Sequence, residues 1–251
     1  YRSRINAEPR HPPLADPMSS TPEQDTPEAA SLTVEAVDEN IAIIARQAIV
    51  DESRAVYGYE LFDRSTASDS HTAASDAALL FNALSYAGTE ALVGKKTVFI
   101  NCTHDSLSGG HLELIHPEKV VLEVPPLPDT ATPEEIEGRV PTLHALRTRG
   151  FRLAFDQAAL RRAYTSWLPL AVFIKLDMQA FKPELAAPRV KFATTRGQAT
   201  LVAEKVETAE QYELMRGLGV KLFQGYWFSK PSLVKATTIR PSQATIIQLI
   251  N

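Results

Sequence analysis

Short apolar runs alternate with longer amphipathic stretches along the chain from Ile41 onward. The runs are rich in Val, Ile and Phe, and they predict strands at 41–50, 56–60, 97–101, 119–124, 151–156, 171–176, 199–204 and 220–224. Most of them lack a strict alternation of apolar and polar residues, which is typical of parallel strands buried on both faces. The stretches between them predict helices at 75–88, 133–150 and 208–219, the last with Thr208 as its N-cap and Gly219 at its end.

Eight strands with intervening helices over about 200 residues predict an α/β fold of the TIM-like (β/α)8 barrel type. An open, doubly wound sheet is the alternative, although no strand is followed by a G-x-G-x-x-G or Walker motif. Residues 1–35 differ from the rest, because they are rich in proline and poor in large apolar side chains. They predict a flexible tail or linker, which leaves 36–232 for the barrel.

Composition narrows the class of protein without identifying a function. The apolar content of 44% is enough for a packed core, and the single cysteine excludes an internal disulfide and fits a reducing cytoplasm. A net charge of −4 and a pI near 5.9 argue against a general nucleic-acid binder. No apolar run is long enough for a membrane span, and we expect a cytoplasmic protein. Because the chain begins at Tyr1, we also expect it to be a piece of a longer protein.

Polar side chains stand at or next to the ends of seven of the predicted strands. They are Glu60, Asn101, Glu123, Asp156, Lys175, Glu204 and Gln224. Any one of them alone is explained as a solvated loop residue or a helix cap. Together they would converge at the carboxyl-end mouth of a barrel, where carboxylates need a cation or a proton between them. Oxygen ligands of this kind suit a hard divalent ion, and Lys175 could act on a metal-bound water or neutralise a phosphate. The residues favour metal-dependent phosphoester hydrolysis or phosphate-ester binding.

The same residues stand in an ordered set of sequence blocks that resembles EAL domains, the cyclic-di-GMP phosphodiesterases of bacteria. The blocks are YELFDR (59–64, similar to E-A-L-x-R), FIN (99–101), VLE (121–123), GFRLAFD (150–156), IKLD (174–177), AEKVET (203–208) and QGY (224–226) followed by Pro231. The resemblance covers about residues 38–232. It implies a variant barrel with one antiparallel strand.

The resemblance also implies roles for individual residues. Glu60, Asn101, Glu123 and Asp156 would bind Mg²⁺ or Mn²⁺, Lys175 would position or activate the hydrolytic water, and Glu204 and Gln224 would complete the shell. Arg64 would contact a phosphate of cyclic-di-GMP, with Leu61 and Pro231 as further ligand contacts. A forked guanidinium suits that task, although an ion pair between Arg64 and Asp63 remains the alternative.

The chain departs from the family pattern at the active-site loop. Family members that are active carry D-D-F-G-T-G after the central strand, and here Gln157 stands in place of the second aspartate, with the rest of the loop absent. Pro126 stands where a glutamate braces that loop in active members. Lys205 replaces the glycine of the A-E-G-V-E block. Loop and brace are missing together, which predicts a degenerate site in which one metal position is weakened or no metal is bound.

Residues 233–251 resemble the start of an HDOD domain, so we expect them to be a junction to a missing C-terminal domain; a terminal helix of the barrel is the alternative. The sequence therefore predicts a bacterial signal-transduction domain that is catalytically impaired or inactive and acts as a regulatory, interaction or nucleotide-sensing module. Its expected partners are cyclic-di-GMP, partner signalling proteins and its own HDOD-like domain. The alternatives are an active Mg²⁺- or Mn²⁺-dependent phosphodiesterase that forms linear pGpG, and a scaffold that binds no nucleotide.

Overall fold

The computed structural model describes residues 41–63 and 93–237. These residues belong to one compact unit, Asp38–Asn251. The predicted tail, the predicted helix 75–88, Arg64 and residues 238–251 lie outside the described residues. Within them, no helix is long and apolar enough to cross a membrane.

The described strands form one nine-stranded sheet. They are β1 (Ile41–Asp51), β2 (Val56–Asp63), β3 (Thr97–Asn101), β4 (Val120–Val124), β5 (Arg152–Asp156), β6 (Ala171–Asp177), β7 (Thr200–Glu204), β8 (Leu222–Phe223) and β9 (Ser232–Thr237). The α-helices are α3 (Pro133–Glu137), α4 (Val140–Thr148), α5 (Ala186–Arg196) and α6 (Ala209–Gly217). Short 3-10 helices are η1 (Ser106–Ser108), η2 (Gly110–Leu114), η3 (Pro117–Lys119), η4 (Gln157–Leu160), η5 (Arg162–Tyr164), η6 (Leu168–Leu170) and η7 (Pro183–Leu185).

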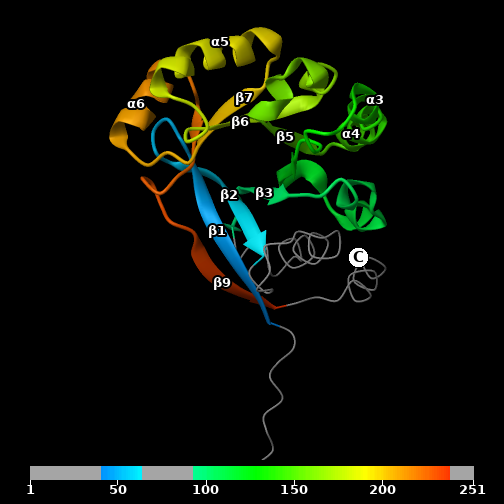
Figure 1. Ribbon diagram of the computed structural model, residues 1–251. Helices are drawn as coiled ribbons and strands as arrows, with labels where there is room; N and C mark the ends of the chain where they lie inside the picture. The colour runs from blue at the N-terminus through cyan, green and yellow to red at the C-terminus, as the bar shows by residue number, and fades with distance from the viewer. Residues whose placement is uncertain (1–40, 64–92, 238–251) are drawn as a thin grey trace, which may run out of the picture. The chain divides into compact units, whose positions relative to one another are not determined.

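Strand β1 closes the sheet into a barrel. Strands β2 to β8 run parallel in sequence order, and β1 is antiparallel to both β2 and β8. The eleven residues of β1 are long enough to pair with two strands along one edge, with β9 over Ile41–Arg46 and with β8 at Val50 and Asp51. The predicted (β/α)8 barrel is thereby confirmed, and so is its single antiparallel strand (Figure 1).

Besides the short 3-10 helices, one α-helix and one strand lie where the sequence pattern predicted none, and one predicted helix is divided. The stretch 133–150 forms α3 and α4 with a break at Gly138 and Arg139. Helix α5 was not predicted; its sequence AAPRVKFATTR contains Pro188 and two threonines near its end, residue types of low helix propensity. Residues Ser232–Thr237, assigned in part to an interdomain junction, form β9 and extend the sheet. The predicted Thr208 cap is confirmed, since its side chain accepts a hydrogen bond from the Gln211 backbone N–H in a full capping box.

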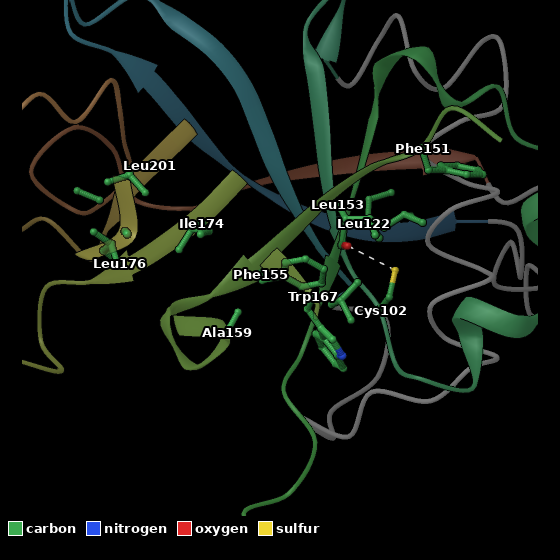
Figure 2. Packing of buried hydrophobic residues seen from close by; sticks show 14 of the residues in the cluster. Cys102, Leu122, Phe151, Leu153, Phe155, Ala159, Trp167, Ile174, Leu176 and Leu201 are labelled. Atoms are coloured by element: carbon green, nitrogen blue, oxygen red, sulfur yellow. Dashed lines mark hydrogen bonds between the residues drawn. The ribbon is translucent and has the colours of Figure 1, made fainter. Parts of the chain in front are cut away.

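Apolar side chains fill both sides of the sheet. The inner cluster consists of Ile49, Phe99, Val121, Ala154, Phe173, Val202 and Leu222. The larger outer cluster packs between the strands and the surrounding helices, and Figure 2 shows Phe155 and Trp167 within it, near Leu122. Burial on both faces explains the missing alternation along the strands. It also explains Cys102, a core residue whose Sγ donates to the Ile100 carbonyl at 3.5 Å (Figure 2).

Candidate functional site

On the inner face of the barrel, a layer of apolar side chains is followed by a layer of polar side chains two residues further along each strand. Side chains two residues apart point to the same face of a strand. Each inner-cluster residue from β3 to β8 is therefore followed, two positions later, by a polar residue on that face: Asn101, Glu123, Asp156, Lys175, Glu204 and Gln224. Glu60 follows Gly58 on β2 in the same way. The apolar layer closes the barrel below, and the polar layer forms its mouth.

Lys175 lies at the centre of this layer. Its Nζ is 2.7 Å from Glu123 Oε2, 3.0 Å from Glu60 Oε2 and 3.1 Å from Glu204 Oε2. Three carboxylates from three strands share one ammonium group; Lys175, Glu60 and Glu123 are buried, and the Glu204 side chain is 20% exposed. The predicted convergence of these residues is confirmed, and within the described residues the shared cation is Lys175.

Glu60 is held by three donors. Its Oε1 accepts from Asn101 Nδ2 at 2.7 Å, and its Oε2 accepts from Gln224 Nε2 at 2.7 Å as well as from Lys175. Gln224 also donates to Gln47 Oε1 at 3.1 Å, and Gln47 in turn donates to the Ser229 carbonyl. This chain of hydrogen bonds joins β1, β2, β3, β6 and the end of β8, and it fixes the orientation of the Glu60 carboxylate.

Burial and charge move the pKa values of this cluster in different directions. Burial alone would raise the pKa of Glu60, but Lys175 and the three hydrogen bonds outweigh it and hold that pKa below its ordinary value. Burial, together with the Glu60 charge, raises the pKa of Glu123 to about 8. Burial would lower the pKa of Lys175, yet the three glutamates keep it well above its ordinary value. Lys175 is therefore a fixed cation, and Glu123 is the carboxyl that holds a proton most readily.

The raised pKa of Glu123 predicts that stability falls with pH. This carboxyl ionises near pH 4.5 in the unfolded chain and near pH 8 in the fold, so between these values the folded state binds more protons. The free energy of unfolding should fall across this window, by at most about 1.4 kcal/mol per pH unit from this group. Glu123→Gln keeps an acceptor for Lys175 but cannot ionise, and its stability should fall less steeply. Urea denaturation at several pH values measures both slopes, and parallel slopes would contradict the assignment.

Two pockets open onto the polar layer and share Glu60 and Glu204 in their walls. One, of about 400 Å³, is lined among others by Asn101, Glu123, Pro126, Asp156 and Lys175. The other, of about 360 Å³, is lined by Gln47, Phe62, Gln179, Lys205, Glu207, Gln224, Gly225 and Tyr226 besides the shared pair. The first pocket contains most of the carboxylates, which are oxygen donors suited to a metal ion. The second contains amide, aromatic and charged groups, which are suited to an organic ligand.

The donor set fits a hard divalent ion in its chemistry but is not arranged around one. Glu60, Asn101, Glu123 and Asp156 present oxygens to one pocket, and the buried Oε1 of Glu123 has no hydrogen-bond partner among the described residues. An unpaired buried carboxylate oxygen is the kind of atom that a cation would satisfy. However, no three His, Cys, Asp or Glu side chains within 41–63 and 93–237 are grouped as a metal site. The positive charge between the carboxylates is that of Lys175.

Asp156 is engaged by the backbone of the altered loop. Its Oδ1 accepts from the Ala158 N–H at 2.7 Å and caps η4, the 3-10 helix that begins at Gln157. Burial raises the pKa of Asp156, which further disfavours its charged form. Gln157 lines neither pocket, and its Oε1 is buried without a hydrogen-bond partner among the described residues. The position of the second aspartate therefore adds no ligand to the mouth.

A direct contact joins the segment that follows β4, which contains Pro126, to the segment that follows β5, which contains Gln157. The Tyr164 hydroxyl accepts from the Leu127 N–H at 3.0 Å and lies 3.3 Å from the Leu127 carbonyl, to which it donates. At the surface, Arg161 pairs with Asp129 at 2.7 Å. The β4–α3 segment, with Pro126 in the pocket wall, is thus fixed to the segment that follows β5.

Removing the buried hydroxyl should loosen this contact. Tyr164→Phe leaves both backbone groups of Leu127 without their partner, and we expect a loss of about 1–3 kcal/mol in the free energy of unfolding. Tyr226→Phe is the matched control, because Tyr226 is 60% exposed and should change stability by less than about 0.5 kcal/mol. Equal effects of the two substitutions in urea denaturation would show that the contact is not a structural brace.

The structure corrects one expected ligand contact and adds others. Leu61 is 1% exposed and belongs to the outer core, so it cannot line the mouth. Phe62, the next residue of β2, points to the opposite face and lines the second pocket. Pro231 is half-buried and lines neither pocket. Gln47 was missed, although a lone amide within the apolar run IARQAIV was a signal that could have identified it.

Comparison with known proteins gives a consistent family. Residues 110–231 match the model of the EAL domain family. The chain is 30% identical over 214 residues, 82% of its length, to the cyclic di-GMP phosphodiesterase CdgJ of Vibrio cholerae, of which the match covers 48%. It is 27% identical over 83% of its length to the uncharacterized protein YuxH of Bacillus subtilis, of which the match covers 52%. The chain thus spans about half the length of the curated relatives it matches.

Solved structures share the fold. The Bacillus subtilis YkuI protein, with an EAL domain in complex with its substrate c-di-GMP and calcium, has a TM-score of 0.60 and 20% identity over 82% of this chain and 60% of that one. Klebsiella pneumoniae BlrP1, in a manganese and cyclic-di-GMP complex, has a TM-score of 0.59 and 26% identity over 79% of this chain and 58% of that one.

Proposed function

We propose that the chain is an EAL domain whose barrel mouth binds cyclic-di-GMP, hydrolyses it very slowly or not at all, and serves as a regulatory, nucleotide-sensing module. The observation that carries the proposal is the state of the carboxylates. Three of them are paired with Lys175, and Asp156 caps a 3-10 helix. Hydrolysis by two metal ions needs free carboxylate ligands for both ions, and this mouth offers fewer.

The second pocket supports retention of binding. Phe62 and Tyr226 present aromatic surface, while Gln179 and Gln224 present amides, in a pocket of about 360 Å³ that adjoins the carboxylates. Aromatic faces stack on bases, and amides can donate and accept hydrogen bonds at their edges. Loss of catalytic ligands leaves these groups in place, so binding and hydrolysis are separable in this site.

An active phosphodiesterase is the second candidate, and one observation favours it. All seven strand-end residues are retained. Six of them line one pocket and the seventh, Gln224, donates a hydrogen bond to Glu60, which is the arrangement that a Mg²⁺- or Mn²⁺-dependent hydrolase would need. In that case a divalent ion would supply the charge that activates water and stabilises the phosphorane-like transition state. Glu60, Asn101, Glu123 and Asp156 would hold it, and Lys175 would bind a phosphate or a water molecule.

The relatives that the chain matches contain sequence beyond the matched region. The relatives are about twice as long as the matched region, which supports an attached domain on which the sensing barrel acts. The resemblance of residues 233–251 to the start of an HDOD domain favours an HDOD-like domain there. Partner signalling proteins would then respond to nucleotide through that domain.

Calorimetry and a turnover assay test the proposal together. We expect cyclic-di-GMP to bind in Ca²⁺, the ion present with the nucleotide in the YkuI structure, and to form little linear product in Mg²⁺ or Mn²⁺. Glu60→Ala should abolish the binding that depends on a divalent ion. Lys221→Met, a substitution in an exposed pair with Glu52, is the control and should leave binding unchanged.

Two results would overturn the proposal. Product formation at rates of about 1 s⁻¹ that disappears in Glu60→Ala would establish the active enzyme instead. Absence of binding at high nucleotide concentration in the presence of Ca²⁺ would leave a scaffold that does not sense nucleotide.

A further inference from the structure

Lys205 adopts an unusual backbone conformation at the mouth of the barrel. Its φ is +56°, and Arg54 is the only other described residue besides glycine with a positive φ. Residues other than glycine rarely adopt a positive φ, and those that do are often found at functional sites. The conformation occurs directly after Glu204, at the carboxyl end of β7.

The conformation brings the Lys205 ammonium to a carboxylate at the end of the neighbouring strand. Its Nζ lies 2.6 Å from Asp177 Oδ2, and the two side chains are 53% and 19% exposed. Asp177 is two residues after Lys175 on β6, so both side chains point to the same face. In the sheet register Asp177 pairs with Glu204, which places the two acids next to each other.

Acidic side chains at the carboxyl ends of the strands are therefore paired with two different ammonium groups. Lys175 pairs with Glu60, Glu123 and Glu204 from below, and Lys205 pairs with Asp177 at the rim of the second pocket. Converging carboxylates attract a divalent ion most strongly when no fixed cation is near them. An ammonium at the rim reduces that attraction and repels an arriving ion.

We infer that Lys205 is a built-in counter-cation that lowers the affinity of this mouth for divalent ions. It acts by occupying Asp177 and by adding a fixed positive charge beside Glu204. It is a positioning and charge-setting residue rather than a catalytic one. The inference deepens the proposed function and rests on it in one respect, since a mouth that holds divalent ions weakly would hydrolyse bound nucleotide slowly.

Removal of the charge should tighten metal binding without any nucleotide present. We expect Lys205→Met to bind Mn²⁺ and Ca²⁺ about tenfold more tightly in calorimetric titrations of the full chain, because a monovalent charge a few ångströms from a divalent ion costs about that factor. Lys205→Gly should show the same gain and should also relieve the positive φ. Lys221→Met is the matched control, because Lys221 forms a similarly short pair with Glu52, at 2.7 Å. This substitution should leave metal affinity unchanged.

A double substitution locates the effect. Asp177→Asn in the Lys205→Met background should remove a large part of the gain, because the released Asp177 carboxylate is then absent. An unchanged metal affinity in both Lys205 variants, or an equal gain in Lys221→Met, would overturn the inference.

The outcome is independent of the nucleotide assay. If the parent chain binds cyclic-di-GMP but the Lys205 variants bind Mn²⁺ no more tightly, the inference fails and the proposed function stands. If the Lys205 variants gain metal affinity but no form of the chain binds nucleotide, the proposed function fails and the inference stands.

Discussion

Replacing Lys175 with methionine is expected to destabilise the barrel by about 3–5 kcal/mol at neutral pH. Methionine fills nearly the same volume but carries no charge. Glu60, Glu123 and Glu204 would then converge in the mouth without the ammonium that each now contacts within 3.1 Å. An uncompensated buried charge is among the most destabilising changes that a single substitution can cause. Urea denaturation of the parent and variant chains measures the loss.

Two further measurements make this prediction specific. The destabilisation should shrink at acidic pH, where the glutamates can take up protons, and on addition of Mn²⁺, which can replace the missing cation. Lys221→Met removes a surface ion pair with Glu52 and should cost about 0–1 kcal/mol. A loss of less than about 1 kcal/mol in Lys175→Met would mean that the Glu60 carboxylate does not depend on this ammonium for its buried charge.

Gly225→Ala is expected to destabilise the protein by about 3 kcal/mol or more and to weaken ligand binding. Gly225 has a φ of +157°, and a Cβ at this position would collide with the carbonyl oxygen, nitrogen and carbon of Val206. The two chain segments are held together there, because the Val206 N–H donates to the Gln224 carbonyl and the Trp227 N–H donates to the Val206 carbonyl. Separating them would displace Gln224 from Glu60.

The matched control lies in the last turn of α6. An added Cβ at Gly217 meets no atom within 4 Å, so Gly217→Ala should be neutral or should stabilise the chain by about 0.5–1 kcal/mol. Denaturation midpoints and cyclic-di-GMP titrations compare the two variants. If Gly225→Ala retains stability and binding, the close approach of the two backbones is not what holds Gln224 in the site.

The barrel and most of its mouth follow from features that a single sequence carries. Short runs rich in β-branched residues are long enough to be strands and too short to be helices, so their positions could be predicted. A polar residue at the end of each run is conspicuous next to apolar neighbours, and the parallel arrangement brings such ends together. A convergence of Lys175 with acidic residues could be predicted, but not which glutamates it pairs with, since that depends on the closure of the barrel by β1.

The sequence-based predictions fail in two ways. They misassign which face of a strand a residue points to, and they miss contacts between residues that are distant in the sequence. Leu61 and Phe62 are both apolar, and only the direction of Glu60 into the mouth decides that Leu61 faces the outer core. Strand β9 could not be predicted, because its stability comes from pairing with Ile41–Arg46, nearly two hundred positions away. The contact between Tyr164 and Leu127 could not be predicted either, since nothing local marks a hydroxyl that will bind a backbone group 37 positions away.

The fate of bound nucleotide tests the central claim most directly. The full chain is incubated with cyclic-di-GMP and Mn²⁺, the protein is separated from free ligand, and the nucleotide that remains bound is released and identified, with Glu60→Ala carried through in parallel. The account predicts that intact cyclic nucleotide is recovered from the parent chain and none from the variant. Recovery of linear product from the parent chain would contradict it, and so would recovery of no nucleotide at all.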